Sequence, residues 1–125
     1  MLMFECWIPG RPPSKKNTKK VVRRYGRTTV IYSKQFREWE QNALVYLKQA
    51  AIGYEVIDCP LEIKLIFHFR NHKNEADVSN LVEAPQDALT KAGVITDDKI
   101  IQVVHAQKVF EGREGISIEL YSIDE

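Results

Sequence analysis

Long apolar runs are missing from this sequence: none approaches the roughly 18–20 residues needed to cross a bilayer. Cysteine is scarce, with only Cys6 and Cys59 and no CxxC spacing. Both cysteines lie in apolar, strand-like stretches, which favours buried thiols in a reducing compartment over a disulfide. The segment Met1 to Gly10 also lacks the basic start and the length of a signal peptide. We therefore expect a cytoplasmic protein.

Acidic residues are absent between Glu5 and Glu38, although the net charge of the chain is only +1. The same stretch carries a run of cations, which are Arg11, Lys15, Lys16, Lys19, Lys20, Arg23, Arg24 and Arg27. Such a charge footprint predicts contact with the phosphate backbone of a nucleic acid. The candidate DNA-binding residues are Lys15, Lys16, Lys19, Lys20, Arg23 and Arg24. The alternative is a solvated loop without a partner.

The length of 125 residues and the hydrophobic content of 44% suit one globular domain with a single core. No repeat and no linker divides the chain, so we expect one domain over residues 1–125. Residues 11–27 are expected to form a mobile basic loop or arm, because residues 14–20 offer nothing apolar to bury. Residues 21–22 and 28–32 flank a Tyr-Gly pair and suggest a small hairpin within this arm.

Hydrophobic periodicity predicts an α+β fold. Residues 3–8 and 61–69 alternate as strands, and apolar residues at helical spacing predict a helix from Lys34, capped by Ser33, to Gly53. A second helix is expected from near Ser79 to Gly93. Because Pro85 cannot donate a backbone hydrogen bond, either the first turn is irregular or the regular helix starts near Ala84. Residues 100–110 and 116–123 are predicted to form a β-hairpin. The expected architecture is a mixed or antiparallel sheet with two helices packed on it.

Acidic residues gather between residues 74 and 98, where Lys91 is the only lysine or arginine. The acids are Glu75, Asp77, Glu83, Asp87, Asp97 and Asp98. Clustered carboxylates repel one another unless a cation lies between them, and oxygen ligands suit Mg²⁺ or Mn²⁺. Each piece alone has a simpler interpretation. Asp77 and Ser79 are good helix caps, and Asp97-Asp98 is typical of a turn before a strand.

Several of these pieces together resemble the RusA family of Holliday junction resolvases. Pro12-Pro13-Ser14 followed by Asn17 is similar to the family's N-terminal loop. Asp77-Val78-Ser79-Asn80-Leu81 is similar to its Asp-x-Asp-Asn-Leu signature. The run from Asp87 to Gly93 and the pair Asp97-Asp98 then follow in the family's order and spacing. The resemblance implies a RusA-like fold.

The resemblance also implies an Mg²⁺-dependent endodeoxyribonuclease that acts as a homodimer and cuts four-way DNA junctions symmetrically. By position, Asp77 and Asp98 match the catalytic and metal-binding aspartates, and Asp97 matches their acidic neighbour. Ser79 stands where the family has its second aspartate, and Glu83 where it has a lysine. We expect Glu83, one helical turn after Ser79, to restore the lost carboxylate. Lys99 or Lys73 would then supply the missing positive charge.

Other interpretations remain open. The changes at Ser79 and Glu83 favour a non-catalytic branched-DNA-binding protein derived from a resolvase, and the basic arm also suits an RNA-binding module, although no RNA-recognition motif is present. His68 and His72 have an HxxxH spacing in a strand-to-loop context, which does not favour a metal site. Trp7 is out of phase with its apolar neighbours, so it is a candidate for base stacking or a dimer contact.

Overall fold

The computed structural model describes residues 1–14, 19–24, 26–73 and 75–123. Its centre is a mixed four-stranded sheet with the order β1-β6-β4-β5. The strands are β1 (Leu2–Pro9), β4 (Leu61–Phe69), β5 (Ile101–Phe110) and β6 (Gly115–Ser122). β6 runs antiparallel to β1 and β4, whereas β5 runs parallel to β4. The prediction of an α+β fold with a mixed sheet is confirmed.

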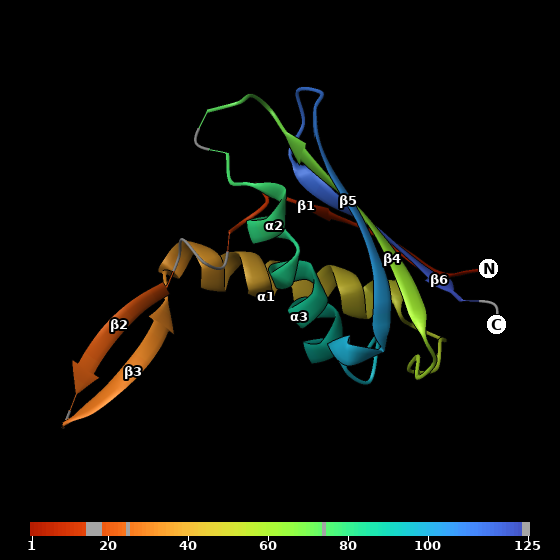
Figure 1. Ribbon diagram of the computed structural model, residues 1–125, viewed down its shortest axis with the longest axis horizontal. Helices are drawn as coiled ribbons and strands as arrows, with labels where there is room; N and C mark the ends of the chain where they lie inside the picture. Colours follow the sequence, from red (N-terminus) through yellow and green to blue (C-terminus); the bar gives the residue numbers. More distant parts are fainter. Residues whose placement is uncertain (15–18, 25, 74, 124–125) are drawn as a thin grey trace.

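The helices cover one face of this sheet (Figure 1). They are α1 (Lys34–Ala50), α2 (Val78–Leu81), α3 (Glu83–Lys91) and the short 3₁₀ helix η2 (Asp98–Ile100). Ser33 caps α1 by accepting a hydrogen bond from the backbone N–H of Phe36 at 3.2 Å. The apolar stripe of α1, which contains Phe36, Trp39, Ala43 and Leu47, is buried as predicted.

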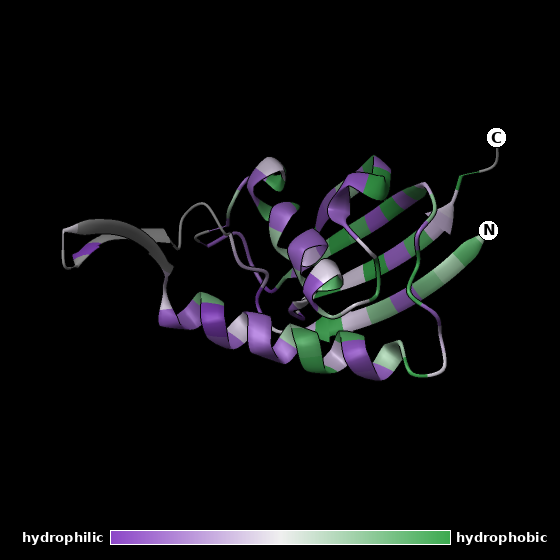
Figure 2. Cartoon of the chain, turned by 90° about the horizontal axis from the view of Figure 1, so that it is seen from below, coloured by the Kyte–Doolittle hydropathy of each residue, from purple (hydrophilic) through white to green (hydrophobic). Residues whose placement is uncertain are grey.

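The core lies between the helices and the inner face of the sheet. Every second residue of β4, from Leu61 to Phe69, is almost fully buried, and so are Ile116, Ile118 and Leu120 of β6. Figure 2 shows the matching alternation of hydrophilic and hydrophobic residues along the strands. Burying these side chains stabilises the fold by roughly 1.5–3 kcal/mol for each large one. None of the described helices is both long and apolar enough to cross a membrane.

The predicted hairpin of residues 100–110 and 116–123 is wrong. Both segments are strands, but β4 lies between them and pairs with each. His68 of β4, for example, faces Val109 on one side and Gly115 on the other. β4 is buried on its inner face along its whole length, and it needs a partner on both edges for its backbone groups. The connection of residues 111–114 therefore passes the end of β4 rather than making a tight turn.

The second helix is interrupted, as the position of Pro85 predicts. α2 ends at Leu81 and α3 begins at Glu83, so Pro85 lies in the first turn of α3, where its missing N–H is tolerated. Val82 between them keeps helical backbone angles of −75° and −22°. The side-chain amide of Gln86 donates to the carbonyl of Val82 at 2.9 Å. The two helices are therefore separate elements with a bend at Val82 between them.

A second, two-stranded antiparallel sheet projects from the body of the molecule (Figure 1). It consists of β2 (Lys19–Arg24) and β3 (Arg27–Tyr32), and it leads directly into α1. The predicted hairpin in the basic segment is thereby confirmed. Its first strand begins at Lys19, inside the stretch that was expected to be a loop.

The outer face of the sheet carries a cluster around Trp7. The indole ring packs edge-on against His68, with ring centroids 5.0 Å apart, and the Arg113 guanidinium lies 4.3 Å from the Trp7 ring centroid. Gly115 lies beneath the indole: a Cβ atom there would be 2.3 Å from Trp7 and 2.8 Å from the carbonyl oxygen of Ile8. A glycine is required at this position because of this close approach.

Candidate active site

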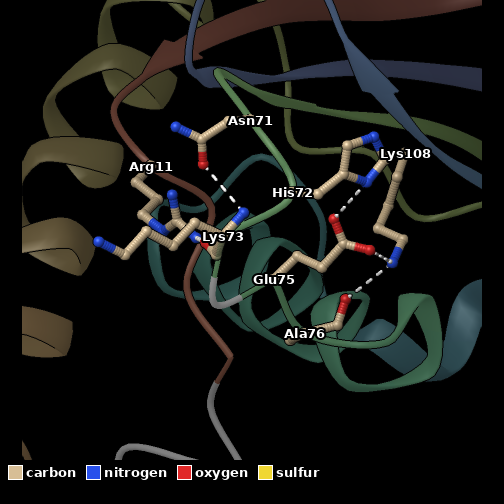
Figure 3. Close-up of polar contacts among 7 residues, drawn as sticks. All are labelled: Arg11, Asn71, His72, Lys73, Glu75, Ala76 and Lys108. Atoms are coloured by element: carbon tan, nitrogen blue, oxygen red, sulfur yellow. Dashed lines mark hydrogen bonds and ion pairs between the residues drawn. The ribbon is translucent and has the colours of Figure 1, made fainter.

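The segment between β4 and α2 is held against β5 by Lys108. The Nζ atom of Lys108 lies 3.0 Å from Oε1 of Glu75 and 3.2 Å from the carbonyl oxygen of Ala76 (Figure 3). His72 Nδ1 lies 3.1 Å from the other oxygen of Glu75, and the His72 ring stacks on Phe110. The hydrogen bond from Lys108 is the main reason that the pKa of Glu75 lies below its ordinary value. These contacts fix the backbone immediately before Asp77.

The same segment is anchored to the N-terminal part of the chain by Arg11. Its guanidinium donates to the carbonyl of Lys73, and the two residues lie side by side in Figure 3. It also donates to Glu114 Oε2 at 3.2 Å. The side chain of Asn71 accepts a hydrogen bond from the backbone N–H of Lys73 at 2.9 Å. Arg11, predicted as part of a DNA-facing cation run, therefore has a structural role as well.

Asp77 is the N-cap residue of α2, but its side chain makes no capping hydrogen bond. The capping alternative therefore does not account for its carboxylate, which is exposed. Ser79 and Glu83 are also exposed, one in α2 and the other in the first turn of α3. Because Val82 keeps helical angles, Ser79 and Glu83 remain about one turn apart.

Asp97 and Asp98 are brought together with Asp87 at the other end of the two helices. Asp97 caps η2 by accepting a hydrogen bond from the Lys99 N–H at 3.0 Å, so the turn interpretation explains part of its role. That bond, together with a hydrogen bond between the two carboxyl groups, lowers the pKa of Asp97. The pKa of Asp98 is raised, first by sharing that hydrogen bond with Asp97, then by burial and by the charges of Asp97 and Asp87. A cation would relieve this repulsion.

A single copy of the described chain does not gather the predicted acids into one group. Among the described residues, no three His, Cys, Asp or Glu side chains are placed to hold a metal ion. Asp77 precedes α2, whereas Asp98 lies in η2 after α3, so both helices lie between them in the sequence. The carboxylate pair Asp97–Asp98 suits a hard cation by its chemistry. The metal ligands Asp77, Asp98, Asp97 and Glu83 remain predictions.

Two charged residues near the site were not predicted. Asp87 was counted among the clustered acids without a role of its own at the site, and its charge acts on Asp98. Lys108 was missed altogether. The signal that could have revealed Lys108 is a lysine at an inward-facing position of a strand. The structure places it in register with the buried Phe67. Of the two lysines expected to supply positive charge, Lys99 acts on Asp97.

The basic arm lies only partly within the described residues. Lys15 and Lys16 are outside them. Lys19, Lys20, Arg23 and Arg24 belong to β2, and the side chain of Arg23 is exposed. The hairpin therefore carries cations away from the main sheet, as a phosphate-binding arm would require.

The histidines all have local partners. His68 Nε2 lies 3.1 Å from Ser117 Oγ, and His68 Nδ1 lies 3.5 Å from Glu111. His105 Nε2 lies 2.6 Å from Glu62. His68 and His72 lie on opposite sides of the sheet, because one contacts Trp7 and the other Phe110. They do not form a ligand pair.

Comparison with known proteins gives two matches. The family model described as endodeoxyribonuclease RusA matches residues 9–121, which include the clustered acidic residues and the whole basic arm. A curated relative, the crossover junction endodeoxyribonuclease RusA of Aquifex aeolicus (strain VF5), is 30% identical over 83 residues. The alignment covers 66% of this chain and 64% of that relative, so the chain spans just under two thirds of its relative's length.

Proposed function

Because this chain belongs to the RusA family of endodeoxyribonucleases, we propose that it resolves Holliday junctions by cutting two opposed strands symmetrically. The observation that carries the proposal is the family match over residues 9–121. The curated relative has the same activity in its name. The protein would thus act in DNA recombination and repair.

The reaction is proposed to be Mg²⁺-dependent phosphodiester hydrolysis, with Mn²⁺ as a possible substitute. Asp77 and Asp98 would hold the ion, with Asp97 and Glu83 in support. The ion, when bound, makes water a better nucleophile and neutralises charge on the phosphate. The raised pKa of Asp98 beside Asp97 supports this assignment, since it marks two carboxyl groups that need a positive partner.

Positively charged residues of the chain would bind the DNA and stabilise the charge that develops during the reaction. Lys15, Lys16, Lys19, Lys20, Arg23 and Arg24 would bind phosphates of the junction arms without reading their sequence. Lys99, next to the acidic pair, would replace the charge that is lost with the family's lysine, because a fixed cation stabilises a developing negative charge. Glu83 stands at that lysine's position and would serve as a carboxylate instead.

A homodimer is part of the proposal. Two symmetric cuts need two sites related by a two-fold axis, and a closed two-fold dimer supplies them.

A second candidate is a protein that binds branched DNA without cutting it. Ser79 in place of an aspartate favours it, as does Glu83 in place of a lysine. The two candidates share the arm and the fold, and they differ only in the metal-dependent step.

One experiment separates the candidates. The purified protein is incubated with a labelled four-way junction, a linear duplex and a hairpin RNA, each with and without Mg²⁺ or Mn²⁺. Paired, metal-dependent nicks in the junction support the resolvase. Junction binding without nicks, under conditions in which the protein is folded, overturns cleavage and leaves the binding protein. A preference for the RNA overturns both.

A further inference from the structure

β5 is an edge strand whose outer edge is left open. It pairs only with β4 among the described strands. Residues 101–107 contain no Lys, Arg, Asp, Glu, Pro or Gly, which are the residues that normally discourage pairing with another chain. Two neighbouring valines, Val103 and Val104, are 40% and 44% exposed. The only interruption is at Gln102, which has no partner in the register with β4.

The ends of this open stretch are occupied. η2 precedes β5, and the segment before α2 lies against Lys108 and Phe110 at the other end. The open part is therefore short, uncharged and centred near Val104. An edge of this kind fits a second strand of the same composition, since two such edges bring no like charges together.

We propose that β5 pairs antiparallel with β5 of a second copy, joining the two four-stranded sheets into one. The two-fold axis passes near Val104. The pairing is inferred from the open edge of β5. Its consequence for function rests on the proposed junction cleavage. It identifies the surface by which the homodimer forms.

The register follows from the faces of the sheet. An axis perpendicular to the sheet keeps inner faces with inner faces, so opposed residues must have the same orientation. With the axis at Val104, the two Val104 side chains meet on the inner face and Val103 faces His105 on the outer face. Moving the axis to His105 would oppose two histidines, each already paired with a Glu62 carboxylate. The valine-centred register buries the more exposed of the two valines.

This pairing places the η2 end of one copy beside the segment that carries Asp77 in the other copy. In an antiparallel pair centred on Val104, the η2 end of one strand lies beside the Lys108–Phe110 end of the other, one strand spacing of about 4.8 Å away. Lys108 holds Ala76, the residue before Asp77, on the helical face. Asp98 of one copy thus comes next to Asp77 of the other. Each site then takes its acids from two chains.

The surface is tested first without DNA or metal, by measuring the mass of the protein in solution across a dilution series. Val104→Lys places two lysines opposite each other and should raise the dimer dissociation constant at least about tenfold. Val45→Lys, at a 55% exposed valine of α1, is the matched control and should leave it unchanged. A Val104→Lys variant that is folded by circular dichroism and dimerises like the wild type overturns the proposal.

Cross-linking tests the register. Val104→Cys should form a disulfide-linked dimer under mild oxidation, because directly opposed Cβ atoms lie about 4.5–5.5 Å apart. The wild type, which keeps Cys6 and Cys59, and Val45→Cys should remain uncross-linked. Cross-linking of Val45→Cys as fast as Val104→Cys would contradict the register.

Mixing two inactive variants tests the shared site. Copies with Asp77→Asn and copies with Asp98→Asn, once mixed and re-equilibrated, form mixed dimers with one intact site. These should nick a junction once, although neither variant cuts alone. No recovery, with exchange confirmed by mass after one variant has been labelled with a heavy isotope, overturns the shared site. A wild-type β5 dimer that never cuts overturns the proposed function and leaves the pairing in place.

Discussion

Lys108 Nζ lies 3.0 Å from Glu75 Oε1, and this ion pair ties an edge strand to the segment that carries Asp77. The pair joins residues that are 33 positions apart in the sequence. Because Lys108 also donates to Ala76, a single side chain sets where α2 begins.

Replacing Lys108 with methionine should destabilise the protein at neutral pH. Lys108 lowers the pKa of Glu75, so its contribution is present above the ordinary glutamate pKa of 4.5 and is lost as pH falls through the lowered value. Urea unfolding of Lys108→Met and wild type should give free energies of unfolding that differ most at pH 7 and approach each other near pH 3. A difference that grows on acidification would contradict the pair. Lys64→Met, on the outer face, is the control.

Gly115→Ala should destabilise the protein by about 1–3 kcal/mol, the usual cost of overpacking. The new methyl group would meet the Trp7 indole at 2.3 Å. Combining it with Trp7→Ala should cost less than the sum of the two single changes, because the indole is then gone. Thermal unfolding of all three variants measures this, and strict additivity would show that the indole does not lie over Gly115.

Asp98→Asn should abolish most junction cleavage while leaving the fold as stable as before or more so. The charges of Asp97 and Asp87 disfavour a charged Asp98, so neutralising it relieves repulsion. Losing a direct ligand of the proposed metal ion should lower the cleavage rate by about a hundredfold or more. Mutating residues that only hydrogen-bond to a metal ligand already lowers metal affinity or activity by about 10–100-fold. Single-turnover cleavage and thermal unfolding are the two measurements. Glu38→Gln, on the exposed side of α1, is the control.

His68 should make the protein less stable at mildly acidic pH. Burial, and then the charge of Arg113, lower the pKa of His68, and these outweigh the opposite effect of Glu111. The unfolded chain therefore binds a proton near pH 6.5 that the folded chain does not, and stability falls as pH drops below that value. His68→Gln should lack this part of the pH dependence when urea unfolding is followed between pH 5 and 8. An identical profile in the variant would mean that His68 titrates normally.

Neutralising Lys15, Lys16, Lys19 and Lys20 to glutamine should flatten the salt dependence of junction binding. Each phosphate contact contributes a slope of about 0.9 in log affinity against log salt, so the four changes should remove roughly three to four units. Four substitutions outside the arm, at Lys34, Arg37, Lys48 and Lys64, form the control. If both sets changed the slope equally, the arm would not be the main DNA contact.

The faces of the elements could be predicted from the sequence far better than their neighbours. The alternation in residues 61–69 gave the buried side of β4, and the stripe from Phe36 to Leu47 gave that of α1, because burial acts residue by residue. Strand order depends on contacts between distant segments. Residues 100–110 and 116–123 therefore suggested a hairpin, although β4 lies between them.

The acidic residues were found by composition, whereas their grouping was not. Asp98 is influenced by the charge of Asp87, to which the sequence assigned no role at the site, and the grouping of Asp77 with Asp98 stays a prediction. A sequence gives the spacing of carboxylates along a helix, and it says little about which end of that helix another segment reaches. Lys108 was missed for the same reason. Its partner Glu75 lies in the connection between β4 and α2, far from Lys108 in the sequence.

The proposed pairing of β5 with β5 would make protein abundance a control on cleavage. The fraction of such an enzyme that is dimeric, and so has complete sites, depends on how many copies a cell contains. At low copy number it is a set of inactive single chains that leave DNA intact. A higher expression level, or the binding of several copies to one DNA crossover, would favour the dimer. Cleavage would then increase without any change in the chain itself.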